Sequence, residues 1–128
     1  MKQLLLILSI ALLAIGCDPS TTTGTENNNS STFKVGNLEV MKEDLGRMSW
    51  DDAKKTCAAL GDGWRLPTKQ ELEILYVNNQ KIGGFDDNYY WSSTEAGYFD
   101  AWLQSFSSGG QVFYFKCYSG YVRAIRAF

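Results

Sequence analysis

Hydrophobic and polar positions follow two periods along the chain, and each change of period marks a predicted element. Over residues 33–41 the period is two on either side of Gly36-Asn37, which predicts a short hairpin with its turn at that dipeptide. Over residues 50–60 the period is helical, with Ser49 as a good N-cap and Gly61 as a good terminator. The apolar face of this first helix places Cys57 in the core.

The first turn of a second helix has its own signature. Thr68 and Glu71 have the spacing of a capping box, in which each side chain accepts from the backbone N–H of the other residue. The predicted buried stripe consists of Leu72, Leu75 and Tyr76. Asn78-Asn79 is the predicted exit, and the residues that follow predict a loop.

From residue 89 onward the pattern predicts strands and turns. Residues 89–94 are strand-like, and residues 101–106 alternate. One face of that second strand holds Trp102, Gln104 and Phe106, and the other holds Ala101, Leu103 and Ser105. A tight turn leads to a further strand at residues 111–116, and residues 121–128 predict another. Two helices packed on a small twisted antiparallel sheet, with long C-terminal loops, indicate an α+β domain.

Composition narrows the function. A chain of 128 residues with 45% hydrophobic content predicts one folded domain, and its formal charge of −2 gives no general attraction to nucleic acid. The chain has no His, which removes the His-dependent nucleophile arrangements, imidazole acid–base chemistry and the usual zinc sites.

The N-terminus predicts export. A basic start and an apolar run over residues 4–15, too short to span a bilayer, indicate a signal peptide over residues 1–16. Gly16-Cys17 resembles the lipobox of bacterial lipoproteins, which implies lipidation of Cys17 and an anchor in the outer membrane, with the domain exposed at the cell surface. An ordinary secretory peptide with a chance Cys is the alternative. Residues 17–32 predict a lipidated Cys and a flexible tether, and residues 33–128 the domain.

Residues 96–121 are rich in Tyr, Phe, Ser and Gly, a composition that suits a binding surface. Phe113, Tyr114 and Phe115 are consecutive, and adjacent residues of a strand point to opposite faces, so at least one of these rings is exposed. The alternative is that the aromatic residues form core. The residues expected to contact a ligand are Tyr98, Phe99, Asp100, Leu103, Ser105, Ser107, Ser108, Val112, Phe113, Tyr114, Phe115, Tyr118, Ser119 and Tyr121.

Three blocks resemble a known family: residues 63–68 (GWRLPT), 90–94 (YWSST) and 122–126 (VRAIR). Together they are similar to the C-type-lectin-like domain at the end of bacterial collagen-like adhesins. The ending, AWxQxFxxGxQ…K…VRAIRAF, is more closely similar to target lipoproteins of diversity-generating retroelements. That resemblance implies a C-terminal segment that is rewritten from a template copy mutated at adenines.

The resemblance also implies which positions are fixed. Adenine mutagenesis of an AAC codon cannot yield Trp, Gln, Lys, Glu or Met. Between residues 96 and 121 the only such residues are Trp102, Gln104, Gln111 and Lys116.

The framework blocks carry the residues expected to be scaffold, which are Trp64, Arg65, Trp91, Trp102 and Arg123. The arginines, with Arg126, are expected to anchor backbone carbonyls or the carboxylates of Glu71 and Glu73. Relatives often carry a Cys where this chain has Ala124, so the resemblance favours Cys57 as a free core thiol. A Cys57–Cys117 disulfide remains open.

Enzymatic and metal-dependent functions are disfavoured. Asp86, Asp87 and Asn88 could bind calcium, but a turn stabilised by their side chains is preferred. Glu71 and Glu73 point in different directions on a helix and do not form a glycosidase pair. The fold also resembles formylglycine-generating oxidases, but their reactive cysteine pair is not reproduced.

We therefore expect a non-enzymatic, monomeric protein without cofactors that binds an external protein or glycan. A glycan-binding adhesin of fixed specificity is one alternative. The other is a structural envelope protein that uses its aromatic patch for oligomerisation.

Overall fold

The computed structural model describes residues 30–128. The predicted signal peptide, the lipidation site at Cys17 and the tether up to residue 29 lie outside the described residues. A compact unit, Ser31–Phe128, holds all the elements below. Within residues 30–128, no helix combines the length and apolarity needed to cross a membrane.

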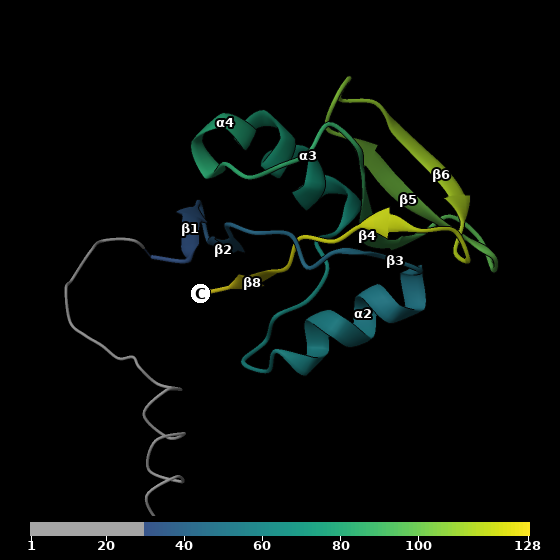
Figure 1. Ribbon diagram of the computed structural model, residues 1–128, viewed down its shortest axis with the longest axis horizontal. Coiled ribbons are helices and arrows are strands. Elements are labelled where there is room, and N and C mark those ends of the chain that lie inside the picture. Colours follow the sequence, from purple (N-terminus) through teal and green to yellow (C-terminus); the bar gives the residue numbers. More distant parts are fainter. Residues whose placement is uncertain (1–29) are drawn as a thin grey trace, which may run out of the picture. The chain divides into compact units, whose positions relative to one another are not determined.

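Two sheets form the centre of the domain (Figure 1). The three-stranded sheet has the order β1-β2-β8, with β1 at Thr32–Val35, β2 at Leu38–Met41 and β8 at Ile125–Ala127. The five-stranded sheet has the order β3-β7-β4-β5-β6, with β3 at Arg47–Met48, β7 at Gly120–Tyr121, β4 at Tyr89–Glu95, β5 at Asp100–Ser105 and β6 at Gln111–Phe115. All pairings are antiparallel except that of β4 with β7.

The predicted hairpin and both predicted helices are confirmed. Gly36, with φ of 59°, occupies the turn between β1 and β2, where a glycine adopts the left-handed region without strain. Helix α2 spans Trp50–Ala59, and Ser49 Oγ accepts from the Asp52 N–H. Helix α3 spans Lys69–Val77 and begins with the complete Thr68–Glu71 capping box.

Helices cover both faces of the five-stranded sheet, α3 and α4 on one and α2 on the other (Figure 1). The α2 side has a core of Trp50, Ala53, Cys57, Trp64, Leu66, Trp91, Ala101, Leu103, Val122 and Ala124. The α3 side has a core of Leu38, Val40, Leu72, Leu75, Ile82, Tyr90, Phe106 and Ile125. Burial of these apolar faces is the main force that holds the layers together.

Two sequence predictions are wrong in detail. Residues 121–128 do not form one strand: β7 and β8 belong to different sheets, because residues 122–124 cross from one sheet to the other. Helix α3 ends at its C-cap Asn78, as predicted, but the residues that follow are not all loop, since a short helix α4 (Asn79–Ile82) precedes Gly83. Strand β3 was not predicted, because a two-residue strand leaves no periodic signal.

The crossing between the sheets is fixed by Arg123, which is fully buried. Its Nε donates to Asp44 Oδ1 at 2.8 Å, and its Nη1 donates to the carbonyls of Met41 at 2.9 Å and Gly83 at 3.0 Å. Its Nη2 lies 2.7 Å from Asp44 Oδ1, at ion-pair distance but without hydrogen-bond geometry. The guanidinium also lies over the Phe85 ring, 3.9 Å from its centroid. The expected anchoring of carbonyls is therefore present, with Asp44 as the carboxylate.

Substituting Glu71 by Ala is expected to lower the free energy of unfolding by about 1–2 kcal/mol at pH 7. Glu71 Oε1 accepts from the Thr68 N–H and from Arg65 Nη1, both at 2.8 Å. The hydrogen bond from Arg65 is the main reason that the pKa of Glu71 is lowered. Urea denaturation of both proteins measures the difference.

The same variant has a defined pH dependence. Because the folded pKa is below the unfolded one, this stabilisation is present above the unfolded pKa and is lost as pH falls through the folded pKa. The gap between parent and variant should therefore narrow in acid. Asp87→Ala, at an exposed carboxylate in a loop, is the matched control and should show little change at any pH. A gap that stays constant down to pH 2 would contradict the assignment.

Candidate functional site

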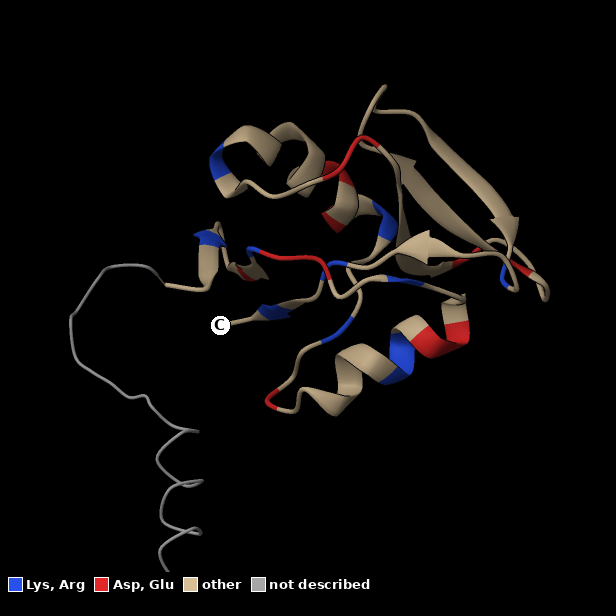
Figure 2. Cartoon of the chain, viewed as in Figure 1, with Lys and Arg blue, Asp and Glu red and all other residues tan. Residues whose placement is uncertain are grey.

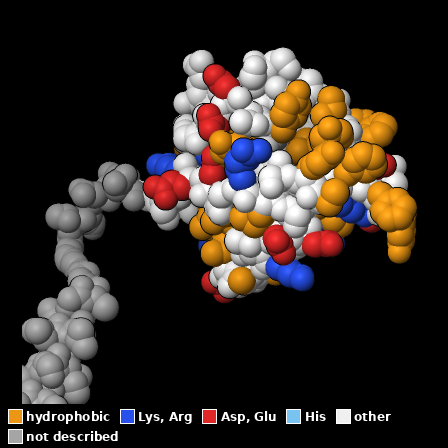
Figure 3. All heavy atoms as spheres, turned by 45° about the vertical axis from the view of Figure 1, so that its right-hand side comes forward, with side chains coloured by type: hydrophobic (Ala, Val, Ile, Leu, Met, Phe, Trp, Pro, Cys, Tyr) orange, Lys and Arg blue, Asp and Glu red, His pale blue; other side chains and the backbone are white. Residues whose placement is uncertain are grey.

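Exposed aromatic side chains gather at one end of the domain, over β5, β6 and the loops that flank them (Figure 3). Tyr98 is 86% exposed and Phe99 is 68% exposed. The other large exposed side chains of this surface are Tyr89, Val112, Phe113, Tyr114, Phe115 and Tyr118. Figure 2 shows the ribbon of β5 and β6 almost without charge, and residues 101–115 contain no charged residue. We call this the aromatic surface.

All three consecutive aromatic residues of β6 are about half exposed, more than the sequence required. The reason is that β6 is the outermost strand of its sheet. Phe113 packs edge-on against Trp102, with ring centroids 5.2 Å apart. Tyr114 lies on the opposite face, 4.6 Å from the ring of Tyr118. The edge position leaves rings accessible from both sides of the sheet.

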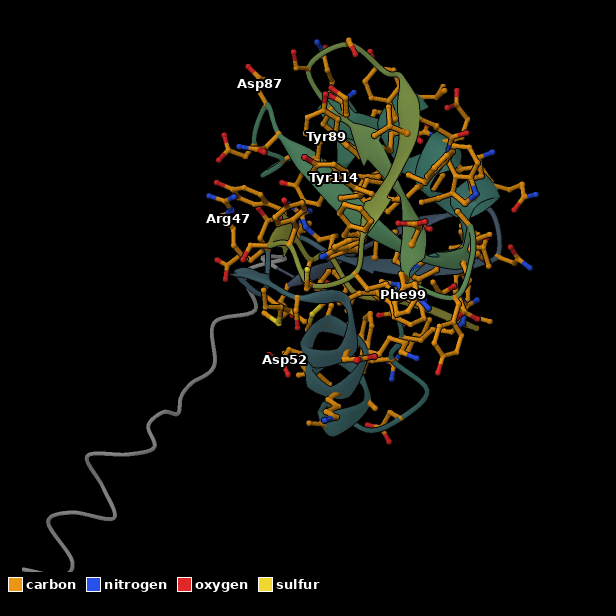
Figure 4. The ribbon with its side chains drawn as sticks, turned by 90° about the vertical axis from the view of Figure 1, so that its right-hand side faces the viewer. Arg47, Asp52, Asp87, Tyr89, Phe99 and Tyr114 are labelled. Atoms are coloured by element: carbon orange, nitrogen blue, oxygen red, sulfur yellow. The ribbon has the colours of Figure 1, made fainter. Side chains whose placement is uncertain are left out.

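A groove of about 590 Å³ opens beside Tyr114. Its lining comes from four strands and the loop after β6, and consists of Arg47, Asn88, Tyr89, Trp91, Leu103, Val112, Phe113, Tyr114, Tyr118 and Ser119. Tyr89 and Tyr114 lie near one another, with Arg47 below them (Figure 4). The Arg47 guanidinium lies 5.4 Å from the centroid of the Tyr121 ring. Concave shape, aromatic walls and a few polar groups are typical of ligand sites.

A second hollow, of about 660 Å³, lies nearer the start of α2. Phe99 borders this second hollow. Figure 4 labels Phe99 beside α2, the helix that contains Asp52. The lining of the hollow consists of Ser49, Asp51, Tyr98, Phe99, Phe115, Lys116 and Cys117. The aromatic residues of the segment thus divide between two neighbouring depressions.

Some of the expected ligand-contacting residues are not at the surface. Leu103 is only 5% exposed and forms part of the groove wall. Ser105 is equally buried, and its hydroxyl accepts from the N–H groups of Ser107 and Ser108, so it shapes the β5–β6 turn. Alternation correctly placed Leu103 and Ser105 on the face of β5 opposite Trp102. That face is covered at its centre by α2 and the neighbouring strands. Asp100 and Tyr121 are partly exposed, and Ser107, Ser108 and Ser119 are exposed.

Besides Trp91, which was expected to be scaffold only, sequence reasoning missed three residues of the groove: Arg47, Asn88 and Tyr89. Arg47 lies in β3, Tyr89 is the first residue of β4, and Asn88 is the loop residue just before it. All three precede the segment of unusual composition, so composition gave no signal for them.

The residues expected to be fixed contact the rigid part of the domain. Gln104 Nε2 donates to Glu73 Oε1 at 2.8 Å, and Gln111 Nε2 donates to the Lys69 carbonyl at 2.9 Å. The Lys69 ammonium lies 3.5 Å from the centroid of the Trp102 ring. These three contacts join the α3 face of β5 and β6 to α3.

Lys116 makes the corresponding contacts on the α2 side of the five-stranded sheet. Its Nζ forms an ion pair with Glu95, donates to the Tyr98 carbonyl at 2.9 Å, and lies 4.4 Å from the centroid of the Trp50 ring. The hydrogen bond from Lys116 is also the main reason that the pKa of Glu95 is lowered. Lys116 therefore joins the end of β6 to α2.

Of the other expected scaffold residues, Trp91 and Trp64 are buried, whereas Arg65 is partly exposed. Trp91 is 1% exposed, and its indole N–H donates to the Met48 carbonyl at 2.9 Å. Trp64 is buried, with the Arg126 guanidinium 4.6 Å from the centroid of its ring. Arg65 pairs with Glu71. Arg126 pairs with Glu39 rather than with Glu71 or Glu73.

The acidic loop at residues 86–88 uses its side chains locally. Asp86 Oδ1 accepts from the Asp87 N–H, and Asn88 Oδ1 accepts from the Tyr89 N–H. Asp86 also accepts from the Tyr121 hydroxyl, which raises the pKa of Tyr121. This is the turn arrangement preferred from the sequence. Among residues 30–128, no group of three or more Cys, Asp or Glu side chains is placed to hold a metal ion.

Both described cysteines are free thiols, Cys57 buried and Cys117 exposed. Burial raises the pKa of the Cys57 thiol to about 11. We expect Cys117 to react with a thiol reagent in the folded protein at least about 100-fold faster than Cys57, because the reactive thiolate of Cys57 is scarce and shielded.

Mass-spectrometric peptide mapping during timed labelling measures both rates. Denaturant is the control and should make the two rates similar. Equal rates in the folded protein would show that α2 opens readily or that Cys57 is not in the core.

The comparisons with known proteins agree with this geometry. No curated protein matches the sequence. The crystal structure of botrocetin is similar with a TM-score of 0.60 and 9% identity, covering 77% of this chain and 98% of that chain. A chain in the complex of botrocetin with a mutant von Willebrand factor A1 domain is similar with a TM-score of 0.54 and 10% identity, over 77% of this chain and 98% of that chain. At such identities the likeness shows the fold, which is the expected α+β C-type-lectin-like fold. Since a model of the Lcl C-terminal domain matches residues 21–126, most of the sequence, the chain belongs to the Lcl C-terminal domain family.

Proposed function

We propose that this chain is a bacterial surface lipoprotein, anchored in the outer membrane through Cys17, whose aromatic surface binds an external protein or glycan. We further propose that residues 96–121 are diversified while the frame stays constant. A C-type-lectin-like fold supports ligand binding in general. A relative of the same fold is seen with a von Willebrand factor A1 domain, which favours a protein ligand over a glycan.

This proposal depends on which side chains within residues 96–121 contact the frame and which lie at the surface. The four residues that adenine mutagenesis of AAC codons cannot produce are Trp102, Gln104, Gln111 and Lys116, and each contacts α2, α3 or their surroundings. Most of the large side chains that such codons can produce point outward, among them Tyr98, Phe113 and Tyr118, whereas Leu103 and Phe106 are buried. A surface of this kind can change its side chains without loss of the contacts that hold it.

Randomising Tyr98, Phe99, Phe113, Tyr114 and Tyr118 with NNC codons is expected to leave most clones folded, with unfolding midpoints close to that of the parent. The reason is that exposed substitutions usually change stability by about 0.5 kcal/mol or less. Thermal scans of individual clones measure this.

The matched control applies the same codons to Trp102, Gln104, Gln111 and Lys116. Here each substitution removes an interior contact, and most clones should be destabilised. Equal tolerance in the two libraries would contradict the proposal. Sequencing of the neighbouring DNA tests diversification itself: a near-copy of the segment that differs at adenines is expected, and its absence would leave an adhesin of fixed specificity.

A further inference from the structure

Strand β6 has one edge that pairs with nothing among the described residues. Its inner edge pairs with β5. The hydrogen bonds from Ser105 N to the Gly110 carbonyl and from Lys116 N to the Phe99 carbonyl show which residues of β6 direct their backbone groups toward β5 and which direct them outward. By that alternation, Val112 and Tyr114 direct their backbone groups toward β5. Gln111, Phe113 and Phe115 then direct theirs outward. Of these outward groups, only the Phe115 carbonyl has a partner within residues 30–128, the Tyr118 N–H at 3.1 Å.

This open edge lacks the usual protections. Natural proteins shield exposed edges with Lys, Pro, bulges or covering segments. Residues 111–115 contain no charge and no Pro, and their register with β5 is regular throughout. Figure 4 shows β6 at the front of the domain, facing the viewer. Such an edge is suited to the addition of another strand.

In place of the monomer expected from the sequence, we infer that the partner at this edge is a second copy of this chain, paired antiparallel through β6 about a two-fold axis at Phe113. In that register Phe113 lies opposite the second copy's Phe113, and Gln111 lies opposite the second copy's Phe115. On the groove face, Val112 lies opposite the second copy's Tyr114, an aromatic and β-branched pair of the kind that stabilises antiparallel strands. The outward N–H and carbonyl groups of Gln111 and Phe113 and the N–H of Phe115 then meet complements, while the Phe115 carbonyl already accepts from the Tyr118 N–H.

The charges near the edge fit a second copy. The ends of β6 differ: Gly109 and Gly110 precede it, and Lys116 follows it, already paired with Glu95. A two-fold axis brings the Lys116 end of one copy to the glycine end of the other, so that no like charges meet. The strand therefore matches its own copy in shape, in polarity and in charge.

The dimer would use Val112, Phe113 and Tyr114 of the groove lining in its contact and leave the groove lining from β3, β4 and the loop after β6 available. Pairing at an edge extends a sheet within its plane, so both grooves lie on the same side of the joined sheet. Two sites on one side can bind a repetitive target with much greater avidity than one. The pairing uses backbone groups, so it tolerates many changes of side chain. It rests on the geometry of β6 and not on the proposed ligand.

Cross-linking at single cysteines tests the pairing and its register. The full chain carrying Cys117→Ser and Phe113→Cys is purified in mild detergent and treated with a methanethiosulfonate linker of about 5 Å. In the proposed register the Cα atoms at position 113 of the two copies are about 5.5 Å apart, and those at position 111 about 14 Å apart. We expect a covalent dimer from Phe113→Cys and none above background from Gln111→Cys. The parent with Cys117→Ser alone reports any background through Cys17 or Cys57.

A charge at the axis supplies an independent test. Phe113→Lys should convert the sedimenting species from dimer to monomer without loss of thermal stability, because Phe113 is half exposed and two ammonium groups would face each other. Val77→Lys, at an exposed position on α3, should remain a dimer. A parent that sediments as a monomer, or equal cross-linking at positions 111 and 113, would overturn the inference. Those outcomes would leave the edge to an external strand or to another register, and they would not affect the library test of the proposed function.

Discussion

Replacing Arg123 by Ala is expected to lower the free energy of unfolding by about 3–5 kcal/mol. The substitution leaves Asp44, which is 19% exposed, without its counter-charge. It also leaves the carbonyls of Met41 and Gly83 without a donor, and a buried polar group that loses its partner costs the full desolvation penalty. A loss of this size is a large part of the stability of a small domain.

Urea or thermal denaturation of the purified chain measures this loss. Arg65→Ala is the matched control, because Arg65 also pairs with a carboxylate but has a side chain that is 42% exposed. A partly exposed pair is worth little, so the control should lose no more than about 1 kcal/mol. Similar losses in the two variants would show that burial of Arg123 does not set the cost.

The double variant Tyr114→Ala and Tyr118→Ala is expected to weaken ligand binding at least about 30-fold, or about 2 kcal/mol, without unfolding the domain. Both rings line the groove and contact each other. Affinity in protein interfaces concentrates in a few central aromatic residues. Because both rings are about half exposed, the cost to stability should not exceed about 1.5 kcal/mol, the worth of their mutual contact.

Arrays of candidate proteins and glycans, probed with the labelled parent and variant, give the comparison. Ile74→Ala with Val77→Ala is the matched control, since it removes exposed apolar side chains from α3 outside the aromatic surface. Binding that survives in the double Tyr variant and fails in the control would move the site to α3. A large fall of the unfolding temperature in the Tyr variant would instead make these rings part of the core.

The helix caps and the hairpin turn were predicted correctly because each depends on only a few neighbouring residues. The Thr68–Glu71 capping box and the Ser49 N-cap satisfy backbone groups of their own first turns, so spacing alone identifies them. The turn at Gly36-Asn37 likewise depends on a single dipeptide. Errors arose where the deciding partner is distant: the run VRAIRAF has the pattern of a strand, but Asp44, far away in sequence, turns Arg123 inward and divides the run.

In the candidate site, too, local features were predicted from the sequence, and features that depend on distant residues were not. Composition identified the segment, and alternation assigned Leu103 and Ser105 to the face of their strand opposite Trp102. Alternation does not say which strand lies at the centre of a sheet and which at its edge. Strand β5 has a neighbour on each side, and Leu103 and Ser105 are buried, whereas β6 is an edge strand, so Phe113, Tyr114 and Phe115 remain accessible. Arg47 entered the site only because β3 is joined to the same sheet through β7.

The sequence by itself therefore determined the two longer helices, their N-caps, most strands, the fold class and the stretch of chain that holds most of the exposed aromatic residues, since each follows from periodicity or composition within a short window. The tertiary structure decided the strand order, the role of Arg123 and the shape of the groove. The physical reason is that strand pairing and burial depend on contacts between residues far apart in the chain, and no local pattern records which of the possible partners will meet.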